Sequence, residues 1–208
     1  MQAPINILRN VLIRIPVVHK LVRYLPKRTT EDDRKILLSR LRPGGVCAEI
    51  GVWKGAFSER IVADTRPEVL YLVDPWAFQP QYPARIYGGK SAQNQGDMDA
   101  IYQGVCRRFD GVKAVRIHRK TFRDFAGSIP QNHLDWIYID GDHSESAVRQ
   151  DLALAWDLVK PGGCIAGDDY GWRDADGSRP VKTAVDDFCR DRNVKRTLIG
   201  YQYVIRKP

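Results

Sequence analysis

Short apolar runs alternate with helical patterns along most of the chain. Each run is short and mostly apolar, as is typical of strands that are buried on both faces of a parallel sheet. Two final runs flank Gly200-Tyr201 and predict an antiparallel hairpin. We therefore expect a doubly wound α/β fold with a mostly parallel sheet. The predicted strands are residues 46–50, 69–73, 113–117, 134–139, 164–166, 196–199 and 202–205, and helices are predicted over residues 30–41, 56–63, 97–109 and 181–190.

Two neighbouring runs in this pattern both end in acidic residues. Asp140 and Asp142 follow the first run, and Asp168 and Asp169 follow the second. A helical pattern joins the two runs and ends at a Pro-Gly-Gly turn. Right-handed crossovers place the carboxyl ends of parallel strands at one edge of a sheet, so these acids should converge there with His143.

Four carboxylates and an imidazole in one small volume require compensation, because like charges raise one another's pKa. A divalent cation would supply that compensation, and we favour this interpretation. The alternative is structural. Asp142 or His143 could cap the helix that begins near Ser144, and Asp168 and Asp169 could cap a loop.

A glycine turn follows the first predicted strand, in the segment EIGVWKG that ends at Gly55. The spacing from Gly51 to Gly55 is G-x-x-x-G. Dinucleotide-binding proteins have G-x-G-x-x-G instead, so a dinucleotide is disfavoured. Asp74 ends the second strand, where an acid commonly binds ribose hydroxyls, although it could also be a turn residue before Pro75.

Residues 76–95 form a long segment without clear periodicity, which is more often functional than idle inside a small domain. Its aromatic residues could form a wall over an acceptor, although half of them could pack the loop down instead. Lys120 and Thr121 follow the third strand, where an adenine would lie if Asp74 binds the ribose. The aromatic residues are Trp76, Phe78, Tyr82 and Tyr87.

The composition suits one domain of a protein from a reducing compartment. The chain has 208 residues, of which 43% are hydrophobic, and four widely spaced cysteines without a C-x-x-C pair. We therefore predict a cytoplasmic protein with a catalytic domain over residues 30–208. No run is long and apolar enough for a signal-peptide core or a transmembrane span.

Residues 1–29 are predicted to form a basic helical arm, which holds much of the net charge of +8. Its apolar face could pack on the domain, bind a second subunit or lie on an anionic membrane. We favour packing or a homodimer over peripheral membrane contact. The charge also permits a nucleic-acid-binding protein, but it is concentrated in the arm, the predicted cleft is acidic, and no base-stacking motif is evident.

Four motifs together resemble the class I S-adenosylmethionine (SAM)-dependent methyltransferases. They are AEIGVWKGAFS, LVDPW, DWIYIDGDHS and PGGCIAGDDY. The closer resemblance is to the metal-dependent sugar O-methyltransferases, which include the macrocin and mycinamicin enzymes, and it covers residues 43–206. It implies a Rossmann-like, seven-stranded sheet with a C-terminal antiparallel hairpin.

The resemblance also implies a set of site residues. Asp140, Asp168 and Asp169 match positions that bind Mg²⁺, with Mn²⁺ or Ca²⁺ as alternatives. His143 matches the general base of some members, and Asp142 matches the position proposed in others. The implied cofactor-binding residues are Glu49, Gly51, Gly55 and Ser58 at the methionine part, Asp74 at the ribose, Lys120 or Thr121 near the adenine, and Asp140.

The predicted reaction is transfer of a methyl group from SAM to a hydroxyl of a saccharide. A mannoside of a mycobacterial polysaccharide is the narrower acceptor that the resemblance suggests. A catechol or another small phenol is the alternative acceptor, and a nicotinamide-dependent oxidoreductase is disfavoured. The predicted acceptor-binding residues are Trp76, Tyr82, Tyr87, Tyr170 and Trp172.

Overall fold

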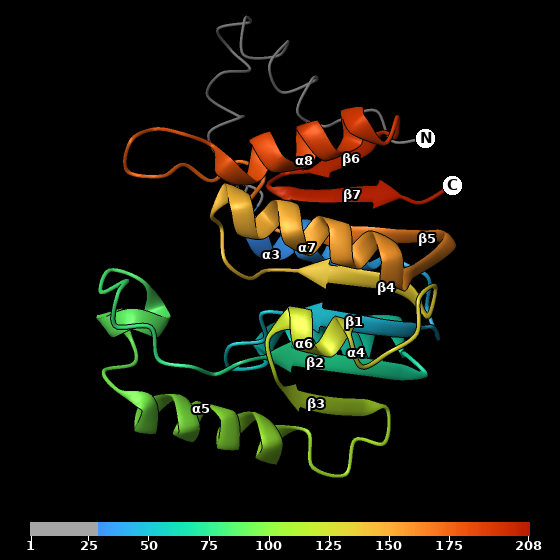
Figure 1. The fold of residues 1–208 in the computed structure, drawn as a ribbon. Helices are drawn as coiled ribbons and strands as arrows, with labels where there is room; N and C mark the ends of the chain where they lie inside the picture. Colours follow the sequence, from blue (N-terminus) through green and yellow to red (C-terminus); the bar gives the residue numbers. More distant parts are fainter. Residues whose placement is uncertain (1–28) are drawn as a thin grey trace, which may run out of the picture.

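A seven-stranded sheet with helices on both faces forms the protein in the computed structural model, which describes residues 29–208 (Figure 1). The strand order is β3-β2-β1-β4-β5-β7-β6. Strands β1 to β5 are parallel, and β7 is antiparallel to both β5 and β6. The predicted fold is confirmed. The strands are β1 (Val46–Ile50), β2 (Val69–Asp74), β3 (Val115–Arg119), β4 (Leu134–Ile139), β5 (Val159–Gly167), β6 (Arg196–Ile199) and β7 (Gln202–Arg206).

The helices divide between the two faces of the sheet. In Figure 1, α6 (Phe122–Ala126), α7 (Glu145–Leu158) and α8 (Pro180–Asp191) lie on the face toward the viewer. They bury residues such as Phe125, Leu152 and Ala184 against that face. The other core contains Leu37, Ile61 and Met98. These residues come from α3 (Thr30–Leu38), α4 (Ala56–Thr65) and α5 (Gln95–Arg108).

The segment between α7 and β5 differs from the prediction. The Pro-Gly-Gly turn was expected to end the helix, but α7 ends earlier, at Leu158, and the turn lies inside β5. A register irregularity between Leu134 and Trp136 accommodates it. Gly162 has φ +79°, a conformation that glycine adopts without strain. β5 therefore continues through Pro161, Gly162 and Gly163, residue types that usually end a strand.

Two short elements were not predicted. The five-residue α6 begins after Thr121, whose side chain accepts a hydrogen bond from the Asp124 backbone N–H. A π-helical turn, η1 (Ile86–Lys90), lies in the segment of residues 76–95. Both are too short to produce a periodic pattern in the sequence.

The predicted basic arm lies outside the described residues except for Thr29. Its proposed packing, homodimer and membrane contacts therefore stay predictions, as does the cytoplasmic location. Among residues 29–208, no helix is long and apolar enough to cross a membrane.

Candidate functional site

The carboxyl ends of β1, β2, β4 and β5 bring the predicted acids to one edge of the sheet, where the strand order reverses between β1 and β4. Ligands commonly bind at such a switch point. Gly51 makes the edge compact. Its φ is +88°, and a Cβ on it would collide with the backbone carbonyl oxygen of Asp140. Glycine at this position therefore lets the turn after β1 lie directly against the end of β4.

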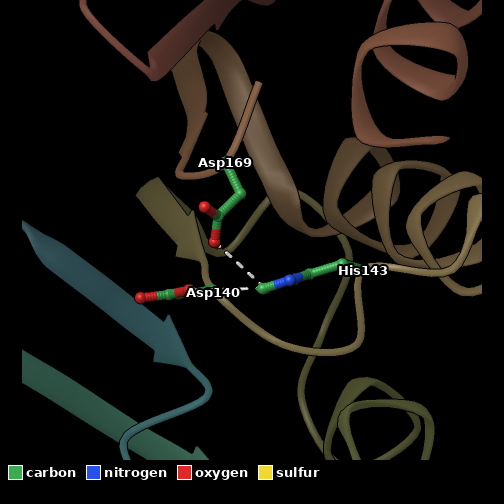
Figure 2. A group of neighbouring side chains, drawn as sticks. All are labelled: Asp140, His143 and Asp169. Atoms are coloured by element: carbon green, nitrogen blue, oxygen red, sulfur yellow. Dashed lines mark ion pairs between the residues drawn. The ribbon is translucent and has the colours of Figure 1, made fainter. Parts of the chain in front are cut away.

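Asp140, His143 and Asp169 form a cluster at this edge, which Figure 2 shows. His143 Nε2 lies 3.1 Å from Asp169 Oδ2 and 3.9 Å from Asp140 Oδ1. One ligand atom from each of the three residues lies within 4.8 Å of the others. Asp169 has φ +61°, which is uncommon for a residue other than glycine and is often found at functional sites.

The protonation of this cluster follows from its burial and charge. Burial raises the pKa of Asp169 to about 6, against the opposing effect of His143. Burial alone would lower the pKa of His143, but the nearby carboxylates of Asp140 and Asp169 outweigh this effect and raise it. With no cation bound, His143 therefore holds a proton more readily than a free imidazole does.

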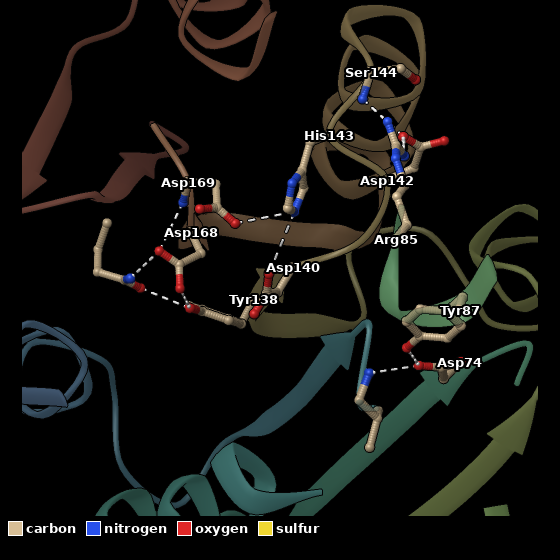
Figure 3. A network of polar contacts seen from close by, with 12 residues as sticks. Asp74, Arg85, Tyr87, Tyr138, Asp140, Asp142, His143, Ser144, Asp168 and Asp169 are labelled. Atoms are coloured by element: carbon tan, nitrogen blue, oxygen red, sulfur yellow. Dashed lines mark hydrogen bonds and ion pairs between the residues drawn. The ribbon is translucent and has the colours of Figure 1, made fainter. Parts of the chain in front are cut away.

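Asp168 is buried and already saturated with donors (Figure 3). Its Oδ2 accepts hydrogen bonds from Arg34 Nη2 at 2.8 Å and from the Tyr138 hydroxyl at 3.3 Å. Its Oδ1 accepts from the Asp169 backbone N–H at 2.8 Å and from the Gln202 side chain. As a metal ligand, Asp168 would first have to release Arg34 or another donor.

Asp74 is also buried and surrounded by donors. Its Oδ2 accepts hydrogen bonds from the backbone N–H groups of Val52 and Trp53, both at 3.0 Å, and from the Tyr87 hydroxyl at 2.6 Å. Its Oδ1 accepts from the Trp76 backbone N–H at 2.7 Å. Figure 3 shows Tyr87 pointing at this carboxylate. A ribose would reach Asp74 only after the Tyr87 hydroxyl moves.

Asp142 lies in the turn that precedes α7 and forms an ion pair with Arg85. Its Oδ1 accepts the backbone N–H of Ser144 at 2.9 Å and lies 2.9 Å from Arg85 Nη1. Ser144 is the N-cap of α7, as predicted, but its side chain makes no capping bond. Burial would raise the pKa of Asp142, but the Ser144 N–H and Arg85 lower it overall. These contacts are those expected if Asp142 has a structural role at the start of α7.

Glu49 is buried near the carboxyl end of β1 and does not reach the surface of the site. It is 1% exposed and accepts a hydrogen bond from the Ser58 hydroxyl. Burial raises the pKa of Glu49 to about 8, against the opposing effect of Ser58. Gly55 is the N-cap of α4, with φ +76°. The predicted residues of the methionine part thus lie together around the first turn of α4.

The predicted adenine residues follow β3 as expected. The Lys120 backbone N–H donates to the Asp74 carbonyl oxygen at 3.2 Å, which ties the end of β3 to the end of β2. Thr121 is exposed, and its hydroxyl is bonded to Asp124. Both residues lie next to the predicted ribose position.

The predicted acceptor-binding aromatic residues differ in burial: some are half-buried or exposed near the acidic edge, and others are buried. Trp172 lies edge-on to His143, with ring centroids 5.3 Å apart. Tyr82 is exposed, under the guanidinium of Arg85. Trp76 is completely buried, so it presents no face to an acceptor, and it is corrected to a core residue. The Tyr87 hydroxyl donates to Asp74, so its acceptor role stays a prediction. Tyr170 is corrected to a structural residue, because it is buried with its hydroxyl bonded to Asp186.

Arg34 and Arg85 have roles that the sequence did not reveal. Arg34 lies 106 positions before Asp140, and Arg85 lies 57 positions before Asp142. No local pattern relates residues at such distances.

A family model described as a methyltransferase domain matches residues 48–170. The match spans more than half of the chain and includes the acidic ends of β1, β2, β4 and β5. The chain belongs to this methyltransferase family. A comparison with curated proteins found no match.

Solved structures of similar fold include SAM-dependent methyltransferases. The O-methyltransferase NovP is 17% identical with a TM-score of 0.59, over 85% of this chain and 80% of NovP. A SAM-dependent methyltransferase from Aquifex aeolicus is 15% identical with a TM-score of 0.53, over 84% and 87% of the two chains. SMU.1697c from Streptococcus mutans, solved with S-adenosylhomocysteine (SAH), is 12% identical with a TM-score of 0.57, over 88% and 100%. At these identities the likeness shows the fold.

Proposed function

We propose that this methyltransferase transfers the methyl group of SAM to a hydroxyl of a saccharide, with the help of a divalent cation. The observation that carries the proposal is the cluster of Asp140, His143 and Asp169 next to the glycine turn after β1. Acids and an imidazole at this position combine groups that could hold a cation with a group that could accept a proton. Both are useful for methylating an alcohol.

The donor atoms of the cluster fit a divalent cation. Two carboxylate oxygens and an imidazole nitrogen lie close enough to share one ion. Mg²⁺ prefers an all-oxygen shell that includes water, so Asp140 and Asp169 would hold it and leave His143 beside it. When bound there, the cation supplies positive charge that acidifies a nearby hydroxyl and lowers the pKa of His143.

The residues of the chain have distinct roles in this proposal. Because Nε2 of His143 faces Asp169, His143 accepts the proton of the acceptor hydroxyl at the other ring nitrogen, Nδ1. Asp169, 3.1 Å away, stabilises the resulting imidazolium. Trp172 packs against the edge of His143 and limits its rotation. The rest of the site holds the acceptor oxygen and the methyl donor in line, which can account for much of the rate acceleration.

The cofactor would lie along the first turn of α4 and the end of β2. The methionine part would approach Glu49, Gly51 and Gly55, and the ribose would bind Asp74 in place of the Tyr87 hydroxyl. The adenine would lie near Lys120 and Thr121. This orientation places the methyl group toward Asp140 and the cluster.

The polar surroundings of the cluster support a saccharide over a phenol. Arg85 and Asp142 form an ion pair near the cluster, with Tyr82 next to Arg85. Trp172, beside His143, offers an apolar surface of the kind that packs on sugar rings. The mannoside of a polysaccharide is the narrower acceptor that we propose, and a catechol is the competing acceptor.

The test measures transfer of a labelled methyl group from SAM to a panel of saccharides, mannosides included, and to a catechol. Each reaction is run with added Mg²⁺ or Mn²⁺ and after exhaustive treatment with EDTA. We expect a saccharide product that disappears after chelation and returns with the metal. Full turnover after chelation would exclude the cation, and methylation of the catechol alone would exclude the saccharide.

A further inference from the structure

Arg34 of α3 reaches across the sheet edge to two acids. Its Nη2 lies 2.9 Å from Asp140 Oδ2 and 2.8 Å from Asp168 Oδ2. The guanidinium carbon lies 4.7 Å from the ring centroid of Phe57, in the first turn of α4. The side chain is 22% exposed. A positive charge is thus held between the ends of β4 and β5 and the start of α4.

The guanidinium has donors to spare. Arginine carries five N–H groups in a planar fork. The bonds to both acids are made by Nη2, whereas Nε is buried and has no hydrogen-bond partner among the described residues. Leaving a buried donor unpaired costs free energy, so an acceptor that reached Nε would be favoured.

This group lies beside the glycine turn. Arg34 contacts the side-chain carboxylate of Asp140. The backbone carbonyl of the same residue lies against Gly51. Phe57, under the guanidinium, comes two residues after Gly55. Arg34 is therefore next to the position where the proposed function places the methionine part of the cofactor.

The methionine part of SAM carries both positive and negative groups, and only the positive ones are attracted by the acidic edge of the sheet. Its ammonium and sulfonium groups are positive and are attracted by Asp140 and Asp168. Its α-carboxylate is negative and would be repelled by the same acids unless a cation faced it. Arginine matches a carboxylate better than lysine does, because its fork can donate two parallel hydrogen bonds.

We propose that Arg34 binds the α-carboxylate of the methionine part of SAM and SAH, an inference that rests on the proposed function. In the structure, Nη2 of Arg34 donates to the carboxylates of both Asp140 and Asp168. On cofactor binding, Arg34 exchanges at least one of them for the cofactor carboxylate, and Nε gains a partner. The Asp140 oxygen that is released becomes available to the cofactor ammonium or to a cation.

The test compares two ligands of the full-length protein by isothermal titration calorimetry. SAH carries the amino-acid part, whereas 5′-methylthioadenosine has the same nucleoside and a thioether but no amino acid. Arg34→Ala should weaken SAH binding by about tenfold or more, as expected for a charged hydrogen bond, and change 5′-methylthioadenosine binding less than about twofold. Arg34→Lys should retain part of the SAH affinity.

Arg42→Ala is the matched control, because Arg42 also pairs with a buried acid, Asp135, but at the opposite edge of the sheet. It should leave both affinities unchanged. Circular dichroism checks the fold of each variant, and Arg34→Lys keeps the test valid if Arg34→Ala does not fold. Equal loss of both ligands would make Arg34 a structural clamp, and no loss would remove it from the site; either result overturns the inference. Failure of the unsubstituted protein to bind SAH would overturn the proposed function as well.

Discussion

His143 Nε2 lies 3.1 Å from Oδ2 of Asp169, although the two residues follow different strands. The left-handed backbone of Asp169, with φ +61°, accompanies this placement of its carboxylate. The contact gives the imidazole a fixed orientation and a negative partner. In the proposed mechanism, this carboxylate would stabilise the imidazolium that forms when His143 takes up a proton.

Replacing His143 by alanine should lower kcat by about a hundredfold or more, since a positioned general base commonly contributes about 10² to 10⁴. SAH affinity, measured by calorimetry, should stay within about twofold, because the predicted cofactor contacts lie elsewhere. His133→Gln is the control. His133 contacts Tyr71 and lies before β4, outside the carboxyl edge.

Titration with Mn²⁺, followed by its electron paramagnetic resonance signal, can show whether His143 acts as a general base or as a metal ligand. If His143 is the base, His143→Ala should bind Mn²⁺ nearly as well as the unsubstituted protein. A loss of more than about tenfold would make His143 a ligand instead, since removing a ligand typically costs at least that much affinity.

Tyr87→Phe should strengthen SAH binding by about tenfold. The Tyr87 hydroxyl donates to Asp74 at 2.6 Å, and a ribose must displace it, which costs the free energy of a hydrogen bond to a charged group. Tyr201→Phe, at an exposed ring, should have no effect. Weaker SAH binding by Tyr87→Phe would mean that the hydroxyl contacts the cofactor rather than competing with it.

Trp76 and Tyr82 should behave differently when truncated, although both were predicted to bind the acceptor. Trp76→Ala should lower the free energy of unfolding by about 3–5 kcal/mol, because the ring is fully buried and leaves a cavity. Tyr82→Ala should change it by less than about 1 kcal/mol, because Tyr82 is 40% exposed. Urea denaturation measures both, and a small loss for Trp76→Ala would contradict its place in the core.

Glu49 should make stability depend on pH. Its ordinary pKa near 4.5 is raised to about 8 in the folded protein, so between these values the folded state binds more protons than the unfolded state. The free energy of unfolding therefore falls as the pH rises from about 4.5 to 8, by at most about 1.4 kcal/mol per pH unit from this group. Burial of the carboxylate is the cause.

Glu49→Gln removes this titration while keeping a polar side chain beside Ser58. Relative to the variant, the unsubstituted protein should lose stability between pH 5 and pH 8, as measured by urea denaturation at a series of pH values. Comparing the two proteins cancels the contributions of other groups that titrate in both. A difference in stability that stays constant over this range would show that Glu49 remains ionised in the fold.

The strands and most helices could be predicted because their signals are local. β1 and β4 match the predicted residues 46–50 and 134–139, and the hairpin at Gly200 forms as expected. The convergence of Asp140 and Asp169 also followed, since parallel strands must end at one edge. The length of β5 was underestimated because Lys160, Pro161 and two glycines interrupt its apolar pattern.

What the sequence by itself determined was the order of strands and helices, the glycine turn and the set of acids at the carboxyl edge. Tertiary structure decided which of those acids are available. Asp168 is held by Arg34, Asp74 by Tyr87 and Asp142 by Arg85, all from segments far away in the chain. Periodicity records which face of an element is buried, but it carries no information on which distant side chain meets a given carboxylate. Those contacts depend on how α3 and residues 76–95 pack over the edge.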